Sequence, residues 1–140
     1  IAKQLEIPYI KVYEVATFYT MYNLAPVGKY FVQVCTTSPC LIRGADRIVK
    51  ICKEKISKEE STLSENKLCS WVEVECLGAC VNSPMMQINN DYYEDLDEKN
   101  TAEIINSLLK DKPIKPKSFR NRTSTKPEKD RSVQNIGKNA

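Results

Sequence analysis

The chain has 140 residues, of which 41% are hydrophobic and 28% charged, so it can build one ordinary domain with a core. The charge is unevenly spread: residues 1–110 carry 12 basic and 15 acidic side chains, and residues 111–140 carry 9 and 3. A nucleic-acid-binding domain usually carries its basic residues on the folded part, so this class is not favoured. No apolar run reaches the roughly 18 residues of a membrane-spanning helix, so we expect membrane association only through a partner.

Two residue types are informative by their scarcity. The sequence contains no histidine, which excludes a Ser-His-Asp triad, a Cys-His dyad, His-type zinc enzymes, haem held by histidine and a Rieske centre in this chain. Its four glycines have neither the dinucleotide-binding nor the P-loop spacing, so we expect no nucleotide site here. Because the chain begins at Ile1 within a helical pattern, we expect it to be part of a longer protein.

The first quarter of the chain changes from helical to extended patterning. Residues 1–7 have the pattern of a helix end, and Pro8 suits the first position of a second helix that runs to Tyr22. Residues 25–28 form a turn. Aromatic and β-branched residues over 29–35 then predict a strand.

The middle of the chain predicts one helix and three strands. Residues 41–56 have an apolar face at helical spacing, and residues 57–70 form a polar loop. Clean alternation predicts a strand over 71–76. Two short strands, 85–88 and 92–94, are separated by an Asn-Asn-Asp turn and form a hairpin.

The last helix completes an α/β pattern. Asp97 can cap a helix that runs to about Lys110. Residues 113–140 are rich in Lys, Pro, Ser, Thr and Asn, and we expect them to be disordered. The order strand, helix, strand, hairpin, helix predicts a small mixed sheet that is compatible with a thioredoxin-like arrangement.

Four of the six cysteines lie in two short loops that follow strands, as Cys35-x4-Cys40 and Cys76-x3-Cys80. Four thiolates hold either a [2Fe–2S] cluster or one zinc ion, and the spacing leaves both open. Disulfides and Cys-x-x-Cys redox chemistry fit the pattern less well. We expect Ser38 to cap a helix whose first turn holds Cys40, where the helix dipole would lower the pKa of its thiol.

Other candidate residues have a structural interpretation. Cys52 lies on the apolar face of a predicted helix and Cys69 lacks a partner at ligand spacing, so we expect both to be buried and unligated. The aromatic side chains before residue 25 could form a docking surface, but residues at helical spacing are more often core. They are Tyr13, Phe18, Tyr19 and Tyr22.

Three longer motifs resemble one family. They are Val34 to Cys40 (VCTTSPC), Glu73 to Pro84 (EVECLGACVNSP) and Asn89 to Leu96 (NNDYYEDL), with VYEVATFYTMYN upstream at residues 12–23. They closely resemble the thioredoxin-like [2Fe–2S] subunit of the NADH-oxidising module of respiratory complex I, over residues 1 to about 116. Ser38 and Ser83 stand where that family leads us to expect Thr and Ala.

The resemblance implies an α/β fold and a cofactor. It implies a thioredoxin-like [2Fe–2S] ferredoxin domain at residues 25–112, preceded by the end of a small helical subdomain at 1–24 and followed by a tail at 113–140. It also implies that Cys35 and Cys40 hold one iron of a [2Fe–2S] cluster, and that Cys76 and Cys80 hold the other.

The resemblance further implies an electron-transfer subunit of NADH:quinone oxidoreductase without catalysis of its own. A partner subunit would bind FMN and NADH, and other subunits of the peripheral arm of complex I would also be partners. The location would be the cytoplasmic face of a bacterial inner membrane or the matrix face of the mitochondrial one. The equivalent subunit of an NAD-dependent hydrogenase or formate dehydrogenase, and a structural zinc module, are the alternatives.

Overall fold

A four-stranded mixed sheet forms the centre of the structure, a computed structural model that describes residues 1–122. Its strands lie in the order β2-β1-β3-β4. β1 and β2 are parallel, whereas β3 is antiparallel to both β1 and β4. Their bounds are β1 Tyr30–Cys35, β2 Cys69–Val74, β3 Met86–Ile88 and β4 Asp91–Tyr93. The predicted mixed sheet is therefore confirmed, with β2 beginning two residues earlier than expected.

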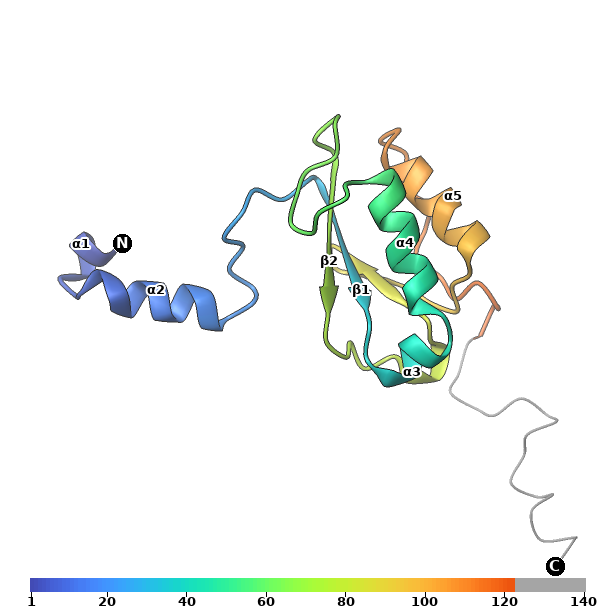
Figure 1. The fold of residues 1–140 in the computed structure, drawn as a ribbon, viewed down its shortest axis with the longest axis horizontal. Coiled ribbons are helices and arrows are strands. Elements are labelled where there is room, and N and C mark those ends of the chain that lie inside the picture. The colour runs from blue at the N-terminus through green and yellow to red at the C-terminus, as the bar shows by residue number, and fades with distance from the viewer. Residues whose placement is uncertain (123–140) are drawn as a thin grey trace, which may run out of the picture.

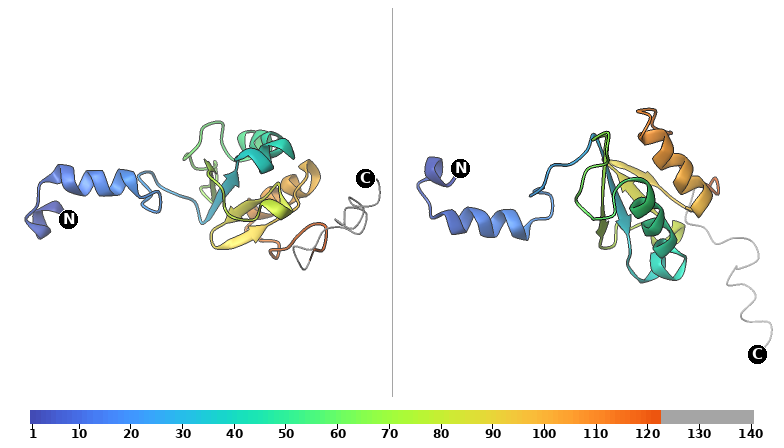
Figure 2. Two further views of the ribbon diagram at one scale, coloured as in Figure 1. Left: turned by 90° about the horizontal axis from the view of Figure 1, so that it is seen from below. Right: turned by 45° about the horizontal axis from the view of Figure 1, so that its top comes forward.

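The helices form a second layer and an N-terminal extension. Figure 1 shows α4 and α5 beside each other on the sheet, and the views in Figure 2 show α1 and α2 standing away from it. A short 3-10 helix, η1, lies in the loop after β2. The bounds are α1 Ala2–Leu5, α2 Tyr9–Phe18, α3 Ser38–Ile42, α4 Ala45–Lys55, η1 Cys80–Asn82 and α5 Glu98–Leu108.

The main core lies between the sheet and the pair α4 and α5. Trp71 of β2, Ile48 of α4 and Ile104 of α5 are at most 1% exposed. The indole N–H of Trp71 donates to the carbonyl of Ser57 at 2.9 Å, so the largest buried side chain leaves no polar group unpaired. This core fixes the sheet on which the cysteine loops are built.

The single helix predicted over 41–56 is wrong, because two helices meet there. α3 ends at Ile42, and Gly44 between the helices has a φ of +100°. That left-handed conformation is open to glycine and ends the regular helix. Leu41, which was expected on the buried face, is consequently 53% exposed.

The predicted cap of the last helix is confirmed. The Asp97 carboxylate accepts from the backbone N–H of Asn100 at 2.8 Å, and the Asn100 side chain accepts from the N–H of Asp97 at 2.9 Å. The two bonds form a reciprocal capping box that satisfies donors at the helix start. The helix therefore begins at Glu98, as the sequence predicts.

The segment after α5 returns to the sheet. The Glu94 N–H donates to the carbonyl of Lys117 at 3.1 Å, and the buried Ser118 hydroxyl donates to the Asp95 carboxylate at 2.6 Å. Residues 113–122 of the expected disordered tail thus contact the sheet. Residues 123–140 lie outside the described part, and the division at residues 24 and 112 stays a prediction.

The N-terminal helices expose apolar side chains. The second helix ends at Phe18 rather than at Tyr22. Phe18 is 76% exposed and Tyr22 58%, so the aromatic residues are not core in this chain, and a docking role for them stays a prediction. Within residues 1–122, no helix has both the length and the apolar character needed to cross a membrane.

Candidate functional site

The parallel pairing of β1 and β2 brings the two cysteine loops to one edge of the sheet. Cys35 is the last residue of β1 and lies opposite Val74, the last residue of β2. The carboxyl ends of adjacent parallel strands lie at the same edge, so the loops that follow leave side by side. Cys76 stands two residues beyond Val74 and therefore just past the level of Cys35.

The first cysteine pair is buried. Cys35 and Cys40 are each 1% exposed and pack with Ala45 and Met85 in a small second core. Cys40 lies in α3, which begins directly after Thr37. The Thr37 hydroxyl is 3.3 Å from the Cys35 sulfur and hydrogen-bonds to it. Burial and this local helix therefore fix both sulfurs.

The second cysteine pair is exposed. Cys76 follows β2, and Cys80 opens the 3-10 helix η1. Their sulfurs lie 3.4 Å apart, and the backbone N–H of Gly78 donates to the Cys76 sulfur at 3.4 Å. Gly78 has a φ of +81°, which suits glycine. The backbone of this loop thus donates a hydrogen bond to one of its own sulfurs.

The loop of the second pair contacts the cluster that holds the first pair. Leu77 and Ala79, which lie between the exposed cysteines in sequence, pack against the buried cluster that contains Cys35 and Cys40. The hydrogen bond with Cys76 is the main cause that raises the pKa of Cys80, and the negative charge of the Cys35 thiolate raises it further. The two predicted ligand pairs therefore lie at the same edge of the sheet, on loops that contact each other.

Within the buried pair, the two thiols differ in pKa. Burial raises the pKa of Cys35, but hydrogen bonds from the Thr37 side chain and backbone outweigh it, so the pKa is lowered overall. Burial, helped by the hydrogen bond with Cys35, raises the pKa of Cys40 to about 12. The expectation of a lowered pKa at Cys40 is wrong: α3 has only five residues, and desolvation outweighs its dipole.

The two thiols of the exposed pair also differ in pKa. The Gly78 N–H, followed by the hydrogen bond from Cys80, lowers the pKa of Cys76. The shared hydrogen bond with Cys76 raises the pKa of Cys80. Each pair thus contains one thiol whose pKa is lowered and one whose pKa is raised. Metal binding would displace any proton on these sulfurs, because the thiolate is the ligand.

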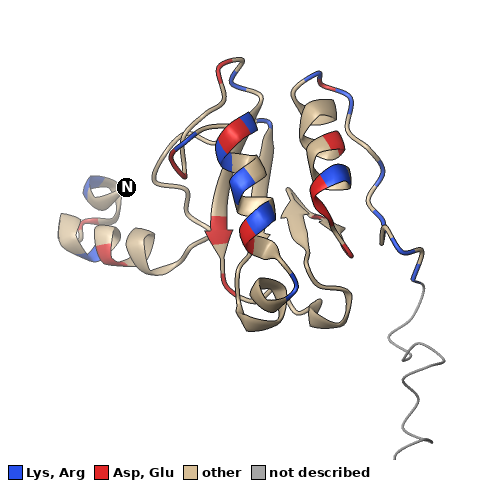
Figure 3. Ribbon diagram, turned by 45° about the vertical axis from the view of Figure 1, so that its right-hand side comes forward, with Lys and Arg blue, Asp and Glu red and all other residues tan. Residues whose placement is uncertain are grey.

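The two cysteine loops carry no charged side chain between their cysteines, although Glu75 directly precedes Cys76 and Arg43 follows α3. Residues 30–42 and 76–90 include no Lys, Arg or Glu, and Asp91 follows only in β4. Figure 3 shows these loops in tan, while charged residues cover the outer faces of α4 and α5. A cluster bound by four thiolates is anionic, and here backbone N–H groups and hydroxyls are the donors available to its sulfurs.

The cysteines form two pairs, one on each loop. A structural zinc site needs four ligands around one point. Two separate pairs are what a [2Fe–2S] cluster uses, because each iron takes two thiolates.

The remaining cysteines are core residues, as expected. Cys52 of α4 and Cys69 of β2 are both 0% exposed. Burial raises the pKa of Cys52 to about 12 and that of Cys69 to about 11. Both thiols are therefore neutral at ordinary pH and behave as small apolar groups.

Two hydroxyl groups at the site escaped prediction. Thr37 had no predicted role of its own within the motif at residues 34–40, although its hydroxyl contacts the Cys35 sulfur. Tyr92 of β4 donates its hydroxyl to the carbonyl of Leu77 at 2.7 Å. The one available signal for Tyr92 was its place in the motif at residues 89–96.

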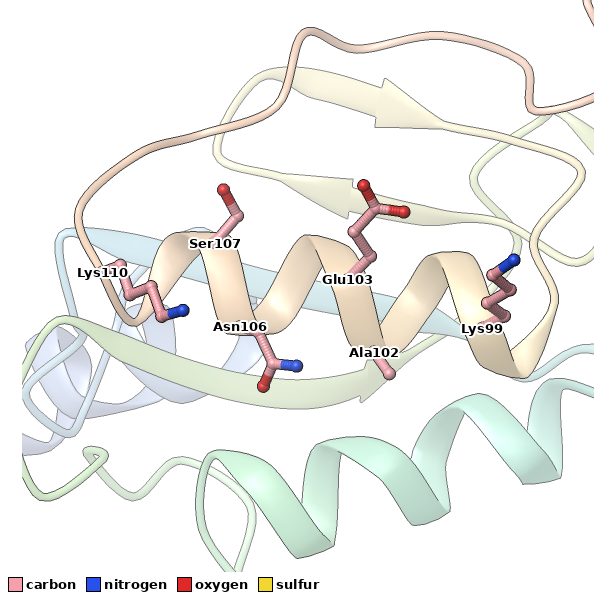
Figure 4. Close-up of a pocket in the computed structure, with 6 residues that line it drawn as sticks. All are labelled: Lys99, Ala102, Glu103, Asn106, Ser107 and Lys110. Carbon is pink, nitrogen blue, oxygen red and sulfur yellow. The ribbon is translucent and has the colours of Figure 1, made fainter.

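A hollow along α5 is separate from the cysteine site. It is lined by side chains of that helix, including Lys99 and Glu103, and by Lys110 just beyond its end, and Figure 4 shows them along α5, with α4 running beside the helix. Its lining holds no cysteine and has the mixed charge of an ordinary helix surface.

Comparison with known proteins gives the family. The model of the thioredoxin-like [2Fe-2S] ferredoxin family matches residues 1–109. The chain belongs to this family. Its cofactor is accordingly a [2Fe–2S] cluster, which the two cysteine pairs fit, and the resemblance seen in the sequence is confirmed.

Curated relatives are similar over most of this chain. An NADH-quinone oxidoreductase subunit of Rickettsia bellii is 54% identical over 111 residues, which are 79% of this chain and 66% of that protein. The corresponding NADH-quinone oxidoreductase subunit of Rhizobium meliloti is 54% identical over 106 residues, 75% of this chain and 38% of that protein. The chain thus spans just under two thirds of the Rickettsia relative and less of the Rhizobium one.

Solved structures support the fold. An NAD+-reducing [NiFe]-hydrogenase gives a TM-score of 0.66 at 15% identity, over 80% of this chain and 19% of the hydrogenase chain. A thioredoxin-like [2Fe-2S] ferredoxin from Aquifex aeolicus gives 0.50 at 20% identity, over 61% of this chain and 90% of that one. The predicted thioredoxin-like α/β fold is therefore confirmed.

Proposed function

We propose that Cys35 and Cys40 bind one iron of the cluster and that Cys76 and Cys80 bind the other. The register that places Cys35 opposite Val74 carries this assignment, because it brings both loops to one edge of the sheet. Each loop holds its two cysteines close together, and each offers a hydrogen-bond donor to a sulfur. The buried Cys52 and Cys69 stay outside the ligand set.

The function proposed is that of an electron-transfer subunit of NADH:quinone oxidoreductase. The 54% identity to the Rickettsia bellii protein supports it over residues that include both cysteine loops. When bound, a [2Fe–2S] cluster accepts and releases one electron at a time. This chain's own residues hold the four sulfurs, shield the first pair from water and offer a hydrogen-bond donor to one sulfur of each pair.

The partner in this proposal is a subunit that binds FMN and NADH. The chain has no histidine and no glycine-rich nucleotide motif, so it depends on a partner for hydride chemistry. Other subunits of the peripheral arm would complete the assembly. The complex would lie at the cytoplasmic face of a bacterial inner membrane, or at the matrix face in a mitochondrion.

A hydrogenase subunit is the alternative function that one observation favours. The fold is similar to part of an NAD+-reducing hydrogenase, which makes the equivalent subunit of a hydrogenase a second candidate. At 15% identity, the similarity to the hydrogenase supports only the fold, whereas the NADH-quinone oxidoreductase relatives are 54% identical in sequence. We therefore favour the NADH:quinone oxidoreductase.

Reduction by NADH tests this function. The chain with its cluster is mixed anaerobically with NADH, alone and with the FMN-binding subunit, and cluster reduction is followed by EPR. We expect reduction only when the flavin subunit is present. Turnover of NADH by the chain alone, or a cluster that stays oxidised beside a reduced flavin subunit, would contradict the proposal.

A further inference from the structure

The loop with the second cysteine pair has little burial to hold its shape. Cys76, Gly78 and Cys80 are all exposed. A side chain added at Gly78 would meet no atom within 4 Å, and Leu77 and Ala79 are the loop residues that pack against buried side chains. Hydrogen bonds therefore contribute to the conformation of the loop between these two contacts.

Strand β4 and the residues after it supply those hydrogen bonds from outside the loop. The Tyr92 hydroxyl donates to the Leu77 carbonyl at 2.7 Å. At the other end, the Asp95 N–H donates to the carbonyl of Asn82 at 2.7 Å, and the Asn82 side-chain amide donates to Glu94 at 2.9 Å. Tyr92 makes the contact that lies between the two cysteines.

The Tyr92 contact acts on the peptide group that faces the Cys76 sulfur. The Leu77 carbonyl and the Gly78 N–H belong to one peptide unit, which is planar and places its C=O and N–H on opposite sides. The carbonyl accepts from Tyr92, and the N–H donates to Cys76. A bond to the carbonyl both orients the unit and strengthens the N–H as a donor.

Tyr92 also ties this loop to the strand that carries the first pair. It pairs with Gln87 of β3, which in turn pairs with Gln33 of β1. β1 ends at Cys35. The sheet therefore holds one cysteine pair directly and the other through the Tyr92 hydroxyl.

We infer that Tyr92 is a positioning residue for the cluster: its hydroxyl fixes the Leu77–Gly78 peptide so that the Gly78 N–H is aimed at the Cys76 sulfur. The inference rests on the proposed ligand role of Cys76. An N–H bond to a cluster sulfur favours the reduced, more negative state, so it raises the reduction potential. Tyr92 thereby contributes to the potential without contacting the iron.

The adjacent tyrosine provides a matched control. Tyr93 donates its hydroxyl to the carbonyl of Ile114, also at 2.7 Å. Neighbouring residues of a strand face opposite sides, so this bond holds the segment after α5 rather than the cysteine loop. Tyr92→Phe and Tyr93→Phe thus remove the same group and the same kind of bond from opposite faces of β4.

The test compares reduction potentials of the full chain with its cluster, wild type and both variants, by EPR-monitored titration. Thermal unfolding of each protein is recorded alongside. We expect Tyr92→Phe to shift the potential to a more negative value, and Tyr93→Phe to keep the wild-type potential whatever its effect on the melting temperature.

Three results would overturn the inference. Equal potentials for all three proteins would show that Tyr92 does not act on the cluster. Equal shifts in both variants would assign the effect to general loosening of β4. A wild-type chain that assembles no [2Fe–2S] cluster on these cysteines would remove the ligand assignment itself, and the inference with it.

Discussion

Cys35 lies opposite Val74 at the shared end of two parallel strands, and Cys76 follows two residues later. This register places a buried sulfur pair beside an exposed one. A buried pair protects one half of a cluster from water, while the exposed pair lies where a redox partner can approach. The site can therefore hold an electron carrier and still present it at the surface.

Replacing a ligand should have a different effect from replacing a buried cysteine. We expect Cys76→Ser to lose most of its iron or to change its EPR signal, because a hydroxyl is a poor substitute for thiolate. Cys52→Ala should keep the wild-type iron content and signal, and lose about 1 kcal/mol of unfolding free energy through the smaller side chain. Iron analysis, EPR and denaturant unfolding measure these effects.

The reverse pattern would contradict the ligand assignment. Full iron content in Cys76→Ser, or a lost cluster in a folded Cys52→Ala protein, would mean that another set of cysteines binds the cluster.

Two glycine variants separate backbone strain from steric overlap. Gly78→Ala should lower the unfolding free energy of the cluster-free chain by about 1–2 kcal/mol, because its φ of +81° is unfavourable for a residue with a Cβ. Gly28→Ala should be more damaging, since its Cβ would lie 2.6 Å from the carbonyl oxygen of Leu68. Gly78→Asn should recover part of the loss, because Asn tolerates this region.

Denaturant unfolding ranks the three variants by their unfolding free energy. If Gly78→Ala unfolds like the wild type, the loop does not hold the left-handed conformation in solution.

Alkaline pH should destabilise the chain through Cys52. Burial raises the pKa of this thiol to about 12 in the folded protein, above the ordinary value near 9. The contribution to stability is therefore fully present below pH 9 and is lost as the pH rises toward 12. We expect the wild-type unfolding free energy to fall over this range more steeply than that of Cys52→Ala, because alanine does not titrate.

The cluster-free chain suits this measurement, because Lys and Tyr titrations are common to both proteins and cancel in the difference. Parallel curves for the two proteins between pH 9 and 12 would show that Cys52 is accessible to ionisation in the folded state.

The polar loop before β2 closes the outer edge of the sheet. The Ser61 N–H donates to the carbonyl of Trp71 at 2.9 Å, and the N–H of Glu73 donates to the Glu60 carboxylate at 3.1 Å. These bonds occupy backbone groups that an edge strand otherwise offers to another chain. The loop thus prevents β2 from pairing with a second sheet.

Replacing residues 58–63 with a short Gly-Ser linker should expose this edge. We expect concentration-dependent association in sedimentation velocity, where the wild type stays at one sedimentation coefficient. Lys115→Ser, a change of an exposed residue after α5, is the control and should leave association unchanged. A linker variant with wild-type sedimentation at all concentrations would contradict a protective role.

The strands and the cysteine pairs could be predicted from the sequence because their signals are local. The β-branched and aromatic content of residues 29–35 predicted β1. Each cysteine pair is separated by only a few residues after a strand, so its two cysteines were expected to lie close together. The Asp97 cap was equally local. Such features depend on neighbours in the chain, which the sequence displays directly.

The features that escaped prediction depend on distant contacts or on competing effects. The apolar spacing continued through Gly44, so its left-handed φ was hidden. The pKa of Cys40 follows burial by other segments, which outweighs the local dipole. Helical spacing could not show whether other segments cover Phe18 and Tyr22, and in the structure both side chains are exposed.

The measurement that tests the cluster assignment most directly is an iron, acid-labile sulfide and zinc determination on anaerobically purified chain, with EPR after dithionite reduction. We predict about two irons and two sulfides per chain and the rhombic signal of a reduced binuclear cluster, as a [2Fe–2S] centre requires. One zinc per chain, with no sulfide and no signal even after reconstitution with iron and sulfide, would contradict it.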